Sequence, residues 1–265
     1  MKPASLVNRG NACWLNTLLQ VLMSCESVVN YSTSHSDDLS TYLLILLRGN
    51  DVASRIANEL RLRLVMRDCP MVNMLTGGQE CIREGLNLML SATDDTFGDL
   101  FLVRMSIRRQ CSACGACKTD DPCKSMYIDI NKSMTETEMA AHVKSSSCVL
   151  DGYRCPHCEC ISTTRQEYRL TRTPPVLILN YSEKKRLDFP QSFKIKGREF
   201  DFRYELVGQV EHMGGAYGGH YYANVSRNDE VWRVDDTSIT PSGYSATGDT
   251  TMLFYQRYSF PKGVL

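Results

Sequence analysis

Residues 6–20 read Leu-Val-Asn-Arg-Gly-Asn-Ala-Cys-Trp-Leu-Asn-Thr-Leu-Leu-Gln, and the rest of the chain is organised around this stretch. Leucines recur at helical spacing and form one apolar face, at Leu15, Leu18, Leu19 and Leu22. Asn11 is a candidate N-cap, and Gly10 allows a tight turn into the helix. Cys13 then lies in the first turn, where unpaired amides and the helix dipole favour a thiolate. The stretch therefore predicts a nucleophilic cysteine.

A segment near the C-terminal end supplies the base that such a nucleophile requires. A lone cysteine more often only packs in a core, so the role of Cys13 depends on this partner. His220 begins a strand-like run, and the turn residues 227–229 precede a second run that ends at Asp235 and Asp236. Antiparallel pairing would place Asp235 beside His220, where a carboxylate can orient the imidazole. Asp236 is the less favoured candidate for that role.

These two segments resemble the cysteine and histidine boxes of the ubiquitin-specific proteases, papain-like cysteine hydrolases that remove ubiquitin. The cysteine box is matched in register by Asn8, Gly10, Asn11, Cys13, Asn16, Leu19 and Gln20. Ala12 stands where the family has Thr, and Trp14 where it has Tyr. The histidine box is matched by Gly219, His220, Tyr221, Ala223, Val225, Trp232, Asp235 and Asp236. Residues 252–255 match the closing strand, so the resemblance extends from Leu6 to Arg257.

The resemblance implies the roles of several side chains. Cys13 is the expected nucleophile, His220 the base and Asp235 its orienting group, while Asn8 and the Cys13 backbone N–H are the expected oxyanion donors. Substrate contacts are implied at five positions, Gln79, Glu80, Gly218, Gly219 and Tyr221. Residues 78–80 are a thinned version of the family's Gly-Gln-Gln-Asp-x-x-Glu segment. The glycine-rich loop at 214–219 is expected to clasp a narrow Gly-Gly tail.

Two Cys-x2-Cys pairs in the middle of the chain indicate a structural metal site. Such knuckles supply four thiolates at tetrahedral spacing, and here they are Cys111, Cys114, Cys155 and Cys158. One structural Zn²⁺ is expected, and the family often carries a zinc ribbon at this place. Further candidate ligands lie nearby, at Cys117, Cys123, Cys148, His157 and Cys160. Any of them could replace an assigned ligand, and the alternative interpretation is that the cysteines bind no metal.

Composition limits the classes of function. The 265 residues carry 30 basic and 30 acidic side chains, which gives no sign of a nucleic-acid or membrane-attracting surface. No apolar run has the ~18 residues of a membrane span, and Met1 does not begin a signal peptide. The 12 cysteines therefore suggest thiols and metal in a reducing compartment. The expected location is the cytoplasm, with the nucleus as an alternative, or the host cytoplasm for a viral protein.

Helical patterns dominate the first part of the chain. One apolar stripe is followed by the helix-stopping Gly49, and it consists of Leu39, Tyr42, Leu43, Leu46 and Leu47. Asp51 could cap a next helix with Ile56, Leu60 and Leu64 on one face. A further helix is expected after 76–78, with inward residues Ile82, Leu86, Met89 and Leu90. These helices are expected to pack around the Cys13 helix.

Strands are expected from about Phe101 onward. Residues 125–130 alternate, 174–181 form an apolar run typical of a strand buried on both faces, and 200–210 carry the inward residues Tyr204, Leu206 and Val210. The predicted fold is α+β, with an antiparallel sheet opposite the helices. The resemblance implies one catalytic domain of 1–265, divided into a helical thumb at about 1–100, zinc-ribbon fingers at about 101–170 and a β palm at about 171–265.

The favoured function is a monomeric, thiol-dependent deubiquitinase that cuts after the terminal glycine of ubiquitin or a ubiquitin-like protein. One alternative is a papain-like protease that processes a polyprotein, viral or otherwise, or other peptides. This alternative remains because the chain reaches its catalytic box almost at once and is compact for the family. Another is an inactive ubiquitin-binding module, but the intact set of Asn8, Cys13, His220 and Asp235 argues against it. No nucleic-acid partner and no membrane span are expected.

Overall fold

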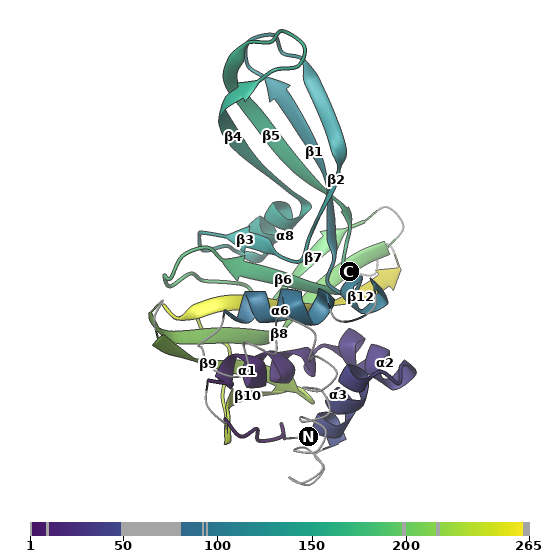
Figure 1. Ribbon diagram of the computed structural model, residues 1–265, viewed down its shortest axis with the longest axis vertical. Coiled ribbons are helices and arrows are strands. Elements are labelled where there is room, and N and C mark those ends of the chain that lie inside the picture. The colour runs from purple at the N-terminus through teal and green to yellow at the C-terminus, as the bar shows by residue number, and fades with distance from the viewer. Residues whose placement is uncertain are drawn as a thin grey trace.

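The computed structural model describes residues 2–8, 11–48, 81–91, 93, 95–197, 200–215 and 218–261. Figure 1 shows a body of helices packed on a large sheet, from which a narrow second sheet projects. The helix expected after Asp51, with Ile56, Leu60 and Leu64, lies outside the described residues, as do Gln79 and Glu80. None of the described helices is long and apolar enough to cross a membrane.

The described helices are α1 (Cys13–Leu22), α2 (Glu26–Ser34), α3 (Asp38–Arg48), α6 (Ile82–Ser91), α7 (Asp95–Gly98) and α8 (Glu136–Lys144). The predicted stripe on α3 is confirmed, since Leu39, Tyr42, Leu43 and Leu46 are buried. On α6, three of the four expected inward residues are also buried, namely Ile82, Leu86 and Met89. These side chains share one core with α1, so the helices pack around the cysteine helix as expected.

Helix α1 lies at the centre of the body. Two glycines permit its close approach to its neighbours: a Cβ at Gly85 of α6 would lie 2.3 Å from the Trp14 ring, and one at Gly208 would lie 2.6 Å from Val21. Trp14 stands where the family has Tyr, and it is completely buried. Its larger ring is accommodated because Gly85 has no side chain. The helix is therefore fixed between α6 and the large sheet.

The N-terminus of α1 differs from the prediction. Ala12, not Asn11, is the N-cap residue, and no side chain caps the helix from that position. Asn11 adopts a left-handed conformation with φ of 53°, a conformation that asparagine tolerates better than most residues. Asn8 instead accepts a hydrogen bond from the Ala12 N–H at 3.0 Å. The expected capping role of Asn11 was therefore wrong, because Asn11 forms the turn and Asn8 supplies the acceptor.

The large sheet has the order β11-β10-β9-β8-β12-β6-β3, with β7 pairing to β8. Its strands are β3 (Ile128–Ile130), β6 (Val176–Tyr181), β7 (Ser192–Lys196), β8 (Phe200–Gly215), β9 (Gly218–Arg227), β10 (Glu230–Asp235), β11 (Ser238–Pro241) and β12 (Thr250–Pro261). Every residue of β6 is buried, which confirms the prediction of a strand covered on both faces. The α+β fold class is likewise confirmed.

Two predicted features of the strands need correction. The strand expected at 125–130 is split, because residues 126–127 leave the ladder between the end of one strand and the start of β3. The large sheet is also not wholly antiparallel: β3 pairs with β6 in parallel, with Ile128 opposite Leu179. A long crossover separates the two strands in sequence, and such a connection permits parallel pairing.

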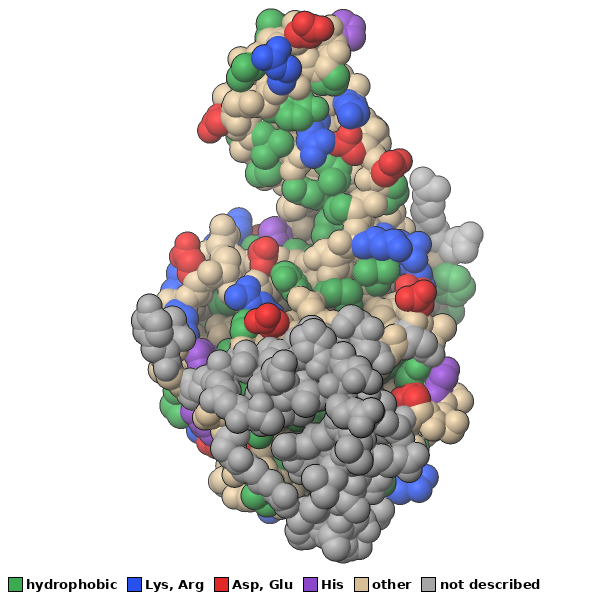
Figure 2. All heavy atoms as spheres, viewed as in Figure 1, with side chains coloured by type: hydrophobic (Ala, Val, Ile, Leu, Met, Phe, Trp, Pro, Cys, Tyr) green, Lys and Arg blue, Asp and Glu red, His purple; other side chains and the backbone are tan. Residues whose placement is uncertain are grey.

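The projecting sheet has the order β2-β1-β5-β4. Its strands are β1 (Val103–Cys111), β2 (Cys117–Ser125), β4 (Ser145–Arg154) and β5 (Ile161–Arg172). Helix α8 packs against β7 at its base and was not predicted, although Thr135 and Glu138 form a complete capping box at its start. Figure 2 shows this sheet standing clear of the body, with hydrophobic side chains on its visible face.

Candidate functional site

The site lies where α1 meets strands β9 and β10. Cys13 is the first residue of α1, and His220 and Asp235 lie on neighbouring strands. The predicted hairpin is confirmed: Asn228 and Asp229 form its turn with φ of 49° and 63°, the left-handed values of a tight hairpin turn. This turn sets the register, with Val234 opposite Ala223, that brings Asp235 within hydrogen-bonding reach of His220.

Asp235 is held by two donors. Its Oδ1 lies 2.6 Å from His220 Nε2, and its Oδ2 accepts a hydrogen bond from Arg233 Nη2 at 3.0 Å. Burial acts to raise the pKa of Asp235, but the hydrogen bonds from His220 and Arg233 outweigh it and leave that pKa below its ordinary value. The Arg233 guanidinium also lies over the Tyr222 ring, 3.8 Å from its centre. Asp235 is therefore an ionised carboxylate in a fixed orientation.

The Cys13 thiol is buried in the first turn of α1, with 3% of the residue exposed. Burial raises the pKa of Cys13, while the backbone N–H groups of Tyr221 and Trp14 act to lower it. The N–H groups of the helix terminus thus favour the thiolate as expected, but in the free protein desolvation is the larger effect. Among the hydrogen bonds of the described residues, none joins Cys13 to His220, although Tyr221 follows His220 directly.

The Asp236 carboxylate lies within 4.8 Å of a His220 ring nitrogen, but its hydrogen bonds connect the cysteine helix to Asn8. Its Oδ2 accepts from Asn8 Nδ2 at 3.0 Å, and its Oδ1 accepts from Asn16 Nδ2 at 2.8 Å. The backbone carbonyl of Asp236 also accepts from the Leu6 N–H at 3.0 Å. Because the Asn8 carbonyl oxygen is bonded to the Ala12 N–H, both ends of the Asn8 amide are fixed.

The structure places the predicted glycine-rich loop differently. Gly214 pairs with Gly219, and Gly215 with Gly218, so four of its residues extend the β8–β9 ladder and not a loop. A Cβ at Gly219 would lie 2.3 Å from His212 Nε2, which explains the glycine there by packing within the hairpin. Residues 216–217, between these pairs, lie outside the described residues.

Tyr221, the remaining expected substrate contact, is buried. Its ring stacks on His212 with the ring centres 4.1 Å apart, and it lines a cavity of about 190 Å³ between the start of α6 and the end of β6. Arg83 and Lys184 contribute charged groups to the same cavity. Tyr221 relates the cavity to the nucleophile, because it lines the cavity and its backbone N–H interacts with the Cys13 thiol.

The four assigned cysteines converge at the tip of the projecting sheet. The Sγ atoms of Cys111 and Cys158 are 3.9 Å apart, and those of Cys114 and Cys155 are 3.8 Å apart. All four Sγ atoms lie within 4.8 Å of one another, so the cluster could hold a metal ion. Within the described part of the chain, no surplus cysteine joins this cluster, and every described cysteine is a free thiol.

Sequence reasoning missed Arg233 and the contacts of Asp236. Arg233 had a signal, because residues two apart on a strand share a face, and Arg233 and Asp235 have that spacing. Asp236 had none, since its partners Asn8 and Asn16 come from the other end of the chain.

Comparison with known proteins finds a match to the family model described as "Ubiquitin carboxyl-terminal hydrolase" over residues 4–255. A probable ubiquitin carboxyl-terminal hydrolase 16 of Schizosaccharomyces pombe is 21% identical and aligns with 89% of this chain. Ubiquitin carboxyl-terminal hydrolase 25 of Arabidopsis thaliana is 24% identical and aligns with 87% of it. The alignments span 62% and 43% of these two relatives' own lengths, so this chain corresponds to part of each.

Solved structures share the fold. A SAGA DUB module containing Ubp8, bound to monoubiquitin, superposes with a TM-score of 0.77 at 16% identity, covering 96% of this chain and 69% of that chain. The Ubp8 module bound to ubiquitin aldehyde gives a TM-score of 0.78 with the same coverage.

Proposed function

Because this chain belongs to the ubiquitin carboxyl-terminal hydrolase family, we propose that it is a thiol-dependent deubiquitinase. It hydrolyses the peptide or isopeptide bond that follows the C-terminal glycine of ubiquitin or a ubiquitin-like modifier. The observation that carries the proposal is the 2.6 Å contact between His220 Nε2 and Asp235 Oδ1. His220 lies on β9, and the backbone N–H of the next residue, Tyr221, interacts with the Cys13 thiol. This arrangement supplies a nucleophile, a base and the group that orients the base.

The hydrogen bond to Asp235 determines the tautomer of His220. An ionised carboxylate can only accept hydrogen bonds, so the neutral imidazole carries its proton on Nε2. Nδ1 is then left with its lone pair and is the atom that takes the Cys13 proton. Because the free thiol is buried with a raised pKa, deprotonation accompanies substrate binding and the approach of the two side chains.

The thiolate attacks the carbonyl carbon of the terminal glycine, and the C=O electron pair moves to the oxygen as an oxyanion. The second N–H of the Asn8 amide is the proposed side-chain donor, since Asp236 occupies the first. The Cys13 backbone N–H is the second donor, because the first N–H groups of a helix have no intrahelical acceptor. His220 then protonates the leaving amine, and water hydrolyses the thioester.

The substrate tail is proposed to approach along the cavity beside Tyr221. At about 190 Å³ this cavity admits a narrow segment and not a folded body. Gly218 and Gly219 begin β9, the strand that also carries Tyr221. Gln79 and Glu80 immediately precede Cys81, which lines the cavity. The glycines of the tail would pass where larger side chains would collide.

The projecting sheet is proposed to bind the folded part of the modifier. It carries two strongly exposed hydrophobic side chains, Val149 and Ile161, at 66% and 63% exposure. The visible hydrophobic surface in Figure 2 extends along this sheet. We therefore retain the division into a thumb at about 1–100, fingers at about 101–170 and a palm at about 171–265, all parts of one monomeric catalytic domain.

The metal of the cysteine cluster is proposed to be a single structural Zn²⁺. Four thiolates at Zn–S distances of about 2.3 Å in a tetrahedron lie roughly 3.8 Å apart, which matches the Sγ separations of 3.8 and 3.9 Å in the structure. Cys111, Cys114, Cys155 and Cys158 would hold the ion, which supplies folding free energy to the fingers and takes no part in the reaction. The free thiols support action in the reducing cytoplasm, with the nucleus as the alternative.

The proposal is tested by reaction with a panel of ubiquitin-like proteins that carry a C-terminal electrophile. Wild-type protein should form a covalent adduct with at least one of them, and Cys13→Ala should form none while still binding that modifier. Cys148→Ala is the matched control, because this cysteine is exposed on the fingers and should leave the adduct unchanged. Cleavage of peptides without reaction with any modifier would instead favour a general papain-like protease.

A further inference from the structure

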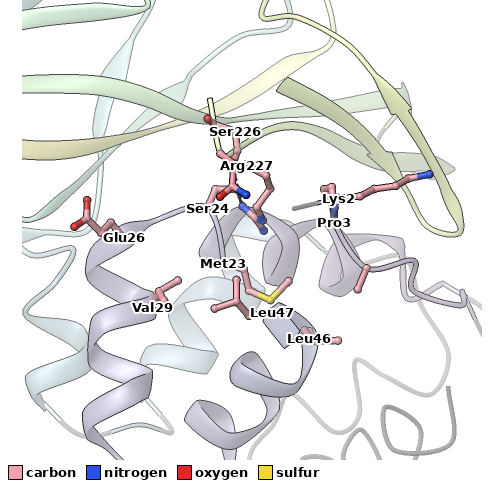
Figure 3. Close-up of a pocket in the computed structure, with 12 residues that line it drawn as sticks. Lys2, Pro3, Met23, Ser24, Glu26, Val29, Leu46, Leu47, Ser226 and Arg227 are labelled. Carbon is pink, nitrogen blue, oxygen red and sulfur yellow. Dashed lines mark hydrogen bonds between the residues drawn. The ribbon is translucent and has the colours of Figure 1, made fainter. Parts of the chain in front are cut away.

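A second cavity, of about 380 Å³, lies at the opposite end of α1 from Cys13. It is bounded by the N-terminal segment, the junction of α1 and α2, the end of α3 and the turn after β9 (Figure 3). Its wall includes the apolar side chains of Met23, Val29, Leu46 and Leu47. A mostly apolar cavity of this size falls at the lower end of the range for small-molecule sites, about 300–1,000 Å³.

The polar end of this cavity is formed by Arg227, the last residue of β9. Arg227 is only 8% exposed, and its side chain extends from the strand toward Ser24 (Figure 3). Nη1 donates to Ser24 Oγ and to the Ser226 carbonyl, and Nη2 donates to the Gln20 carbonyl at 2.7 Å. Every one of these acceptors is uncharged, and a guanidinium has five N–H donors.

The charge of Arg227 is not balanced within the described part of the chain. No described carboxylate forms an ion pair with it; the ionisable groups that act on it are Cys25 and Tyr244, whose pKa values burial raises, so both stay neutral. Glu26 also lines the cavity, but its side chain points away from Arg227 in Figure 3 and hydrogen-bonds to Tyr258. Lys2 points outward as well, with its ammonium over the Trp232 ring. A buried cation without a counter-charge is costly, and an anionic ligand would relieve that cost.

We propose that this cavity binds a small aliphatic carboxylate. The carboxylate would accept hydrogen bonds from Arg227, the side chain whose planar donors suit a carboxylate best. The hydrocarbon chain would lie against Met23, Leu46 and Leu47, which exclude water. The apolar wall favours such a ligand over a sugar phosphate, whose hydroxyls would lose their hydrogen bonds there. This inference does not depend on the proposed hydrolase activity.

A purely structural role for Arg227 predicts a different result. The side chain joins the C-terminal end of α1 to β9, and it could do only that. In that case the cavity would show no preference for a carboxylate. The two interpretations are therefore separated by ligand binding to variants in which Arg227 itself is unchanged.

The experiment measures binding of decanoate and of decanol by calorimetry, together with the melting temperature, below the micellar concentration of decanoate. Wild-type protein should bind decanoate at least tenfold more tightly than decanol and melt at a higher temperature with it. Leu47→Trp fills the cavity and keeps Arg227, so it should weaken decanoate binding at least tenfold. Arg227→Lys should weaken it as well, because the bidentate geometry is lost. Arg203→Lys, on an exposed ion pair with Glu205, is the matched control and should bind as wild type does.

Three results would overturn the proposal. The first is the absence of decanoate binding to the wild-type protein. The second is equal affinity for decanoate and decanol, which would show an apolar cavity with no role for the guanidinium. The third is unchanged decanoate affinity in a folded Leu47→Trp protein, which would place the ligand elsewhere.

Discussion

Asp236 accepts a hydrogen bond from Asn8 Nδ2 at 3.0 Å, across 228 positions of sequence. The same carboxylate accepts from Asn16 Nδ2 at 2.8 Å, so it holds one side chain before the cysteine helix and one within it. The two adjacent aspartates therefore have separate tasks: Asp235 orients His220, and Asp236 orients the proposed oxyanion donor. Strand β10 ends at Asp235, and Asp236 begins a turn with a left-handed φ of 52°, so the backbone changes direction between the two carboxylates and they reach different partners.

Replacing Asp236 should reduce catalysis without abolishing binding. The Asp236 carboxylate accepts from the side-chain amides of Asn8 and Asn16. Asp236→Asn replaces one of its two acceptor oxygens with an amino group, so Asn8 is held less firmly. We expect kcat to fall by roughly ten- to a hundredfold with KM within a few-fold of wild type, because misplacing a catalytic group by ~1 Å has effects of this size. Steady-state hydrolysis of a fluorogenic ubiquitin substrate measures both constants.

A double-variant comparison shows whether Asp236 acts through Asn8. Asn8→Ala alone should lower kcat by about a hundredfold or more if its amide donates to the oxyanion. The combined Asn8→Ala and Asp236→Asn protein should then be little slower than Asn8→Ala. Asn16→Ala is the matched control, since it leaves the Asp236–Asn8 bond in place. Fully multiplicative losses would contradict the assignment and indicate an independent role for Asp236.

Arg233 should tune the pH profile through Asp235. Arg233→Gln removes a cation that helps to hold the pKa of Asp235 below its ordinary value. The carboxylate would then be protonated at a higher pH, so the acid limb of kcat/KM should shift upward, while activity at neutral pH, where the carboxylate stays ionised, should change little. Arg233→Lys keeps the charge and should restore most of the acid limb. A profile of unchanged shape in Arg233→Gln would show that the contact is only structural.

Local patterns in the sequence were sufficient for much of the fold. The leucine stripes of α3 and α6, the apolar run of β6 and the turn at Asn228 all depend on neighbours a few residues away. These features could be read from the chain because helix and strand periodicities are local. The assignment of Cys13 and His220 to one site rested on the need of a nucleophile for a base and was strengthened by the resemblance, since nothing local connects the two ends of the chain.

The errors have a common physical cause. The raised pKa of Cys13 results from burial by the sheet, and the parallel pairing of β3 results from the path of a distant crossover. At the helix N-terminus, the Ala12 N–H is bonded to Asn8, and Asn8 is bonded to the distant Asp236, while Asn11 forms the turn. Each of these features is set by tertiary contacts, which single-residue preferences do not encode.

One zinc ion per chain should be bound at the tip of the fingers. Elemental analysis should find it in the wild-type protein and lose it in Cys111→Ser and Cys155→Ser, whose Sγ atoms belong to the cluster. Cys117→Ser is the matched control, because Cys117 is exposed and lies outside the cluster. In these two variants, amide hydrogen exchange should accelerate in the four-stranded projecting sheet more than in α1, since structural zinc stabilises its surroundings locally. Metal-free protein with intact fingers would disprove this.

Glu211 forms a buried polar network beneath the site. The Glu211 residue is fully buried. Its Oε1 accepts hydrogen bonds from Gln209 Nε2 at 2.5 Å and from Thr250 Oγ1 at 3.1 Å. Its Oε2 accepts a hydrogen bond from Thr247 Oγ1 at 2.6 Å. Burial raises the pKa of Glu211 to about 7, although the threonine hydroxyls act to lower it. The folded protein therefore holds a proton that the unfolded chain, with an ordinary carboxyl pKa of 4.5, releases earlier.

This difference predicts that the free energy of unfolding declines as the pH rises. Between the unfolded pKa of 4.5 and the folded pKa of about 7, the native state binds more protons than the unfolded state, so alkalinity favours unfolding. The stabilisation is complete below pH ~4.5 and is lost by pH ~7, with a full contribution of about 3 kcal/mol. Glu211→Gln removes the titrating group, and its stability should exceed that of wild type above pH ~7. Urea titrations from pH ~5 to ~8 measure the difference between the two proteins. Glu230→Gln, exposed on the β9–β10 hairpin, is the control for a lost surface charge. If the difference between wild type and Glu211→Gln does not change with pH, Glu211 does not titrate in this range on folding.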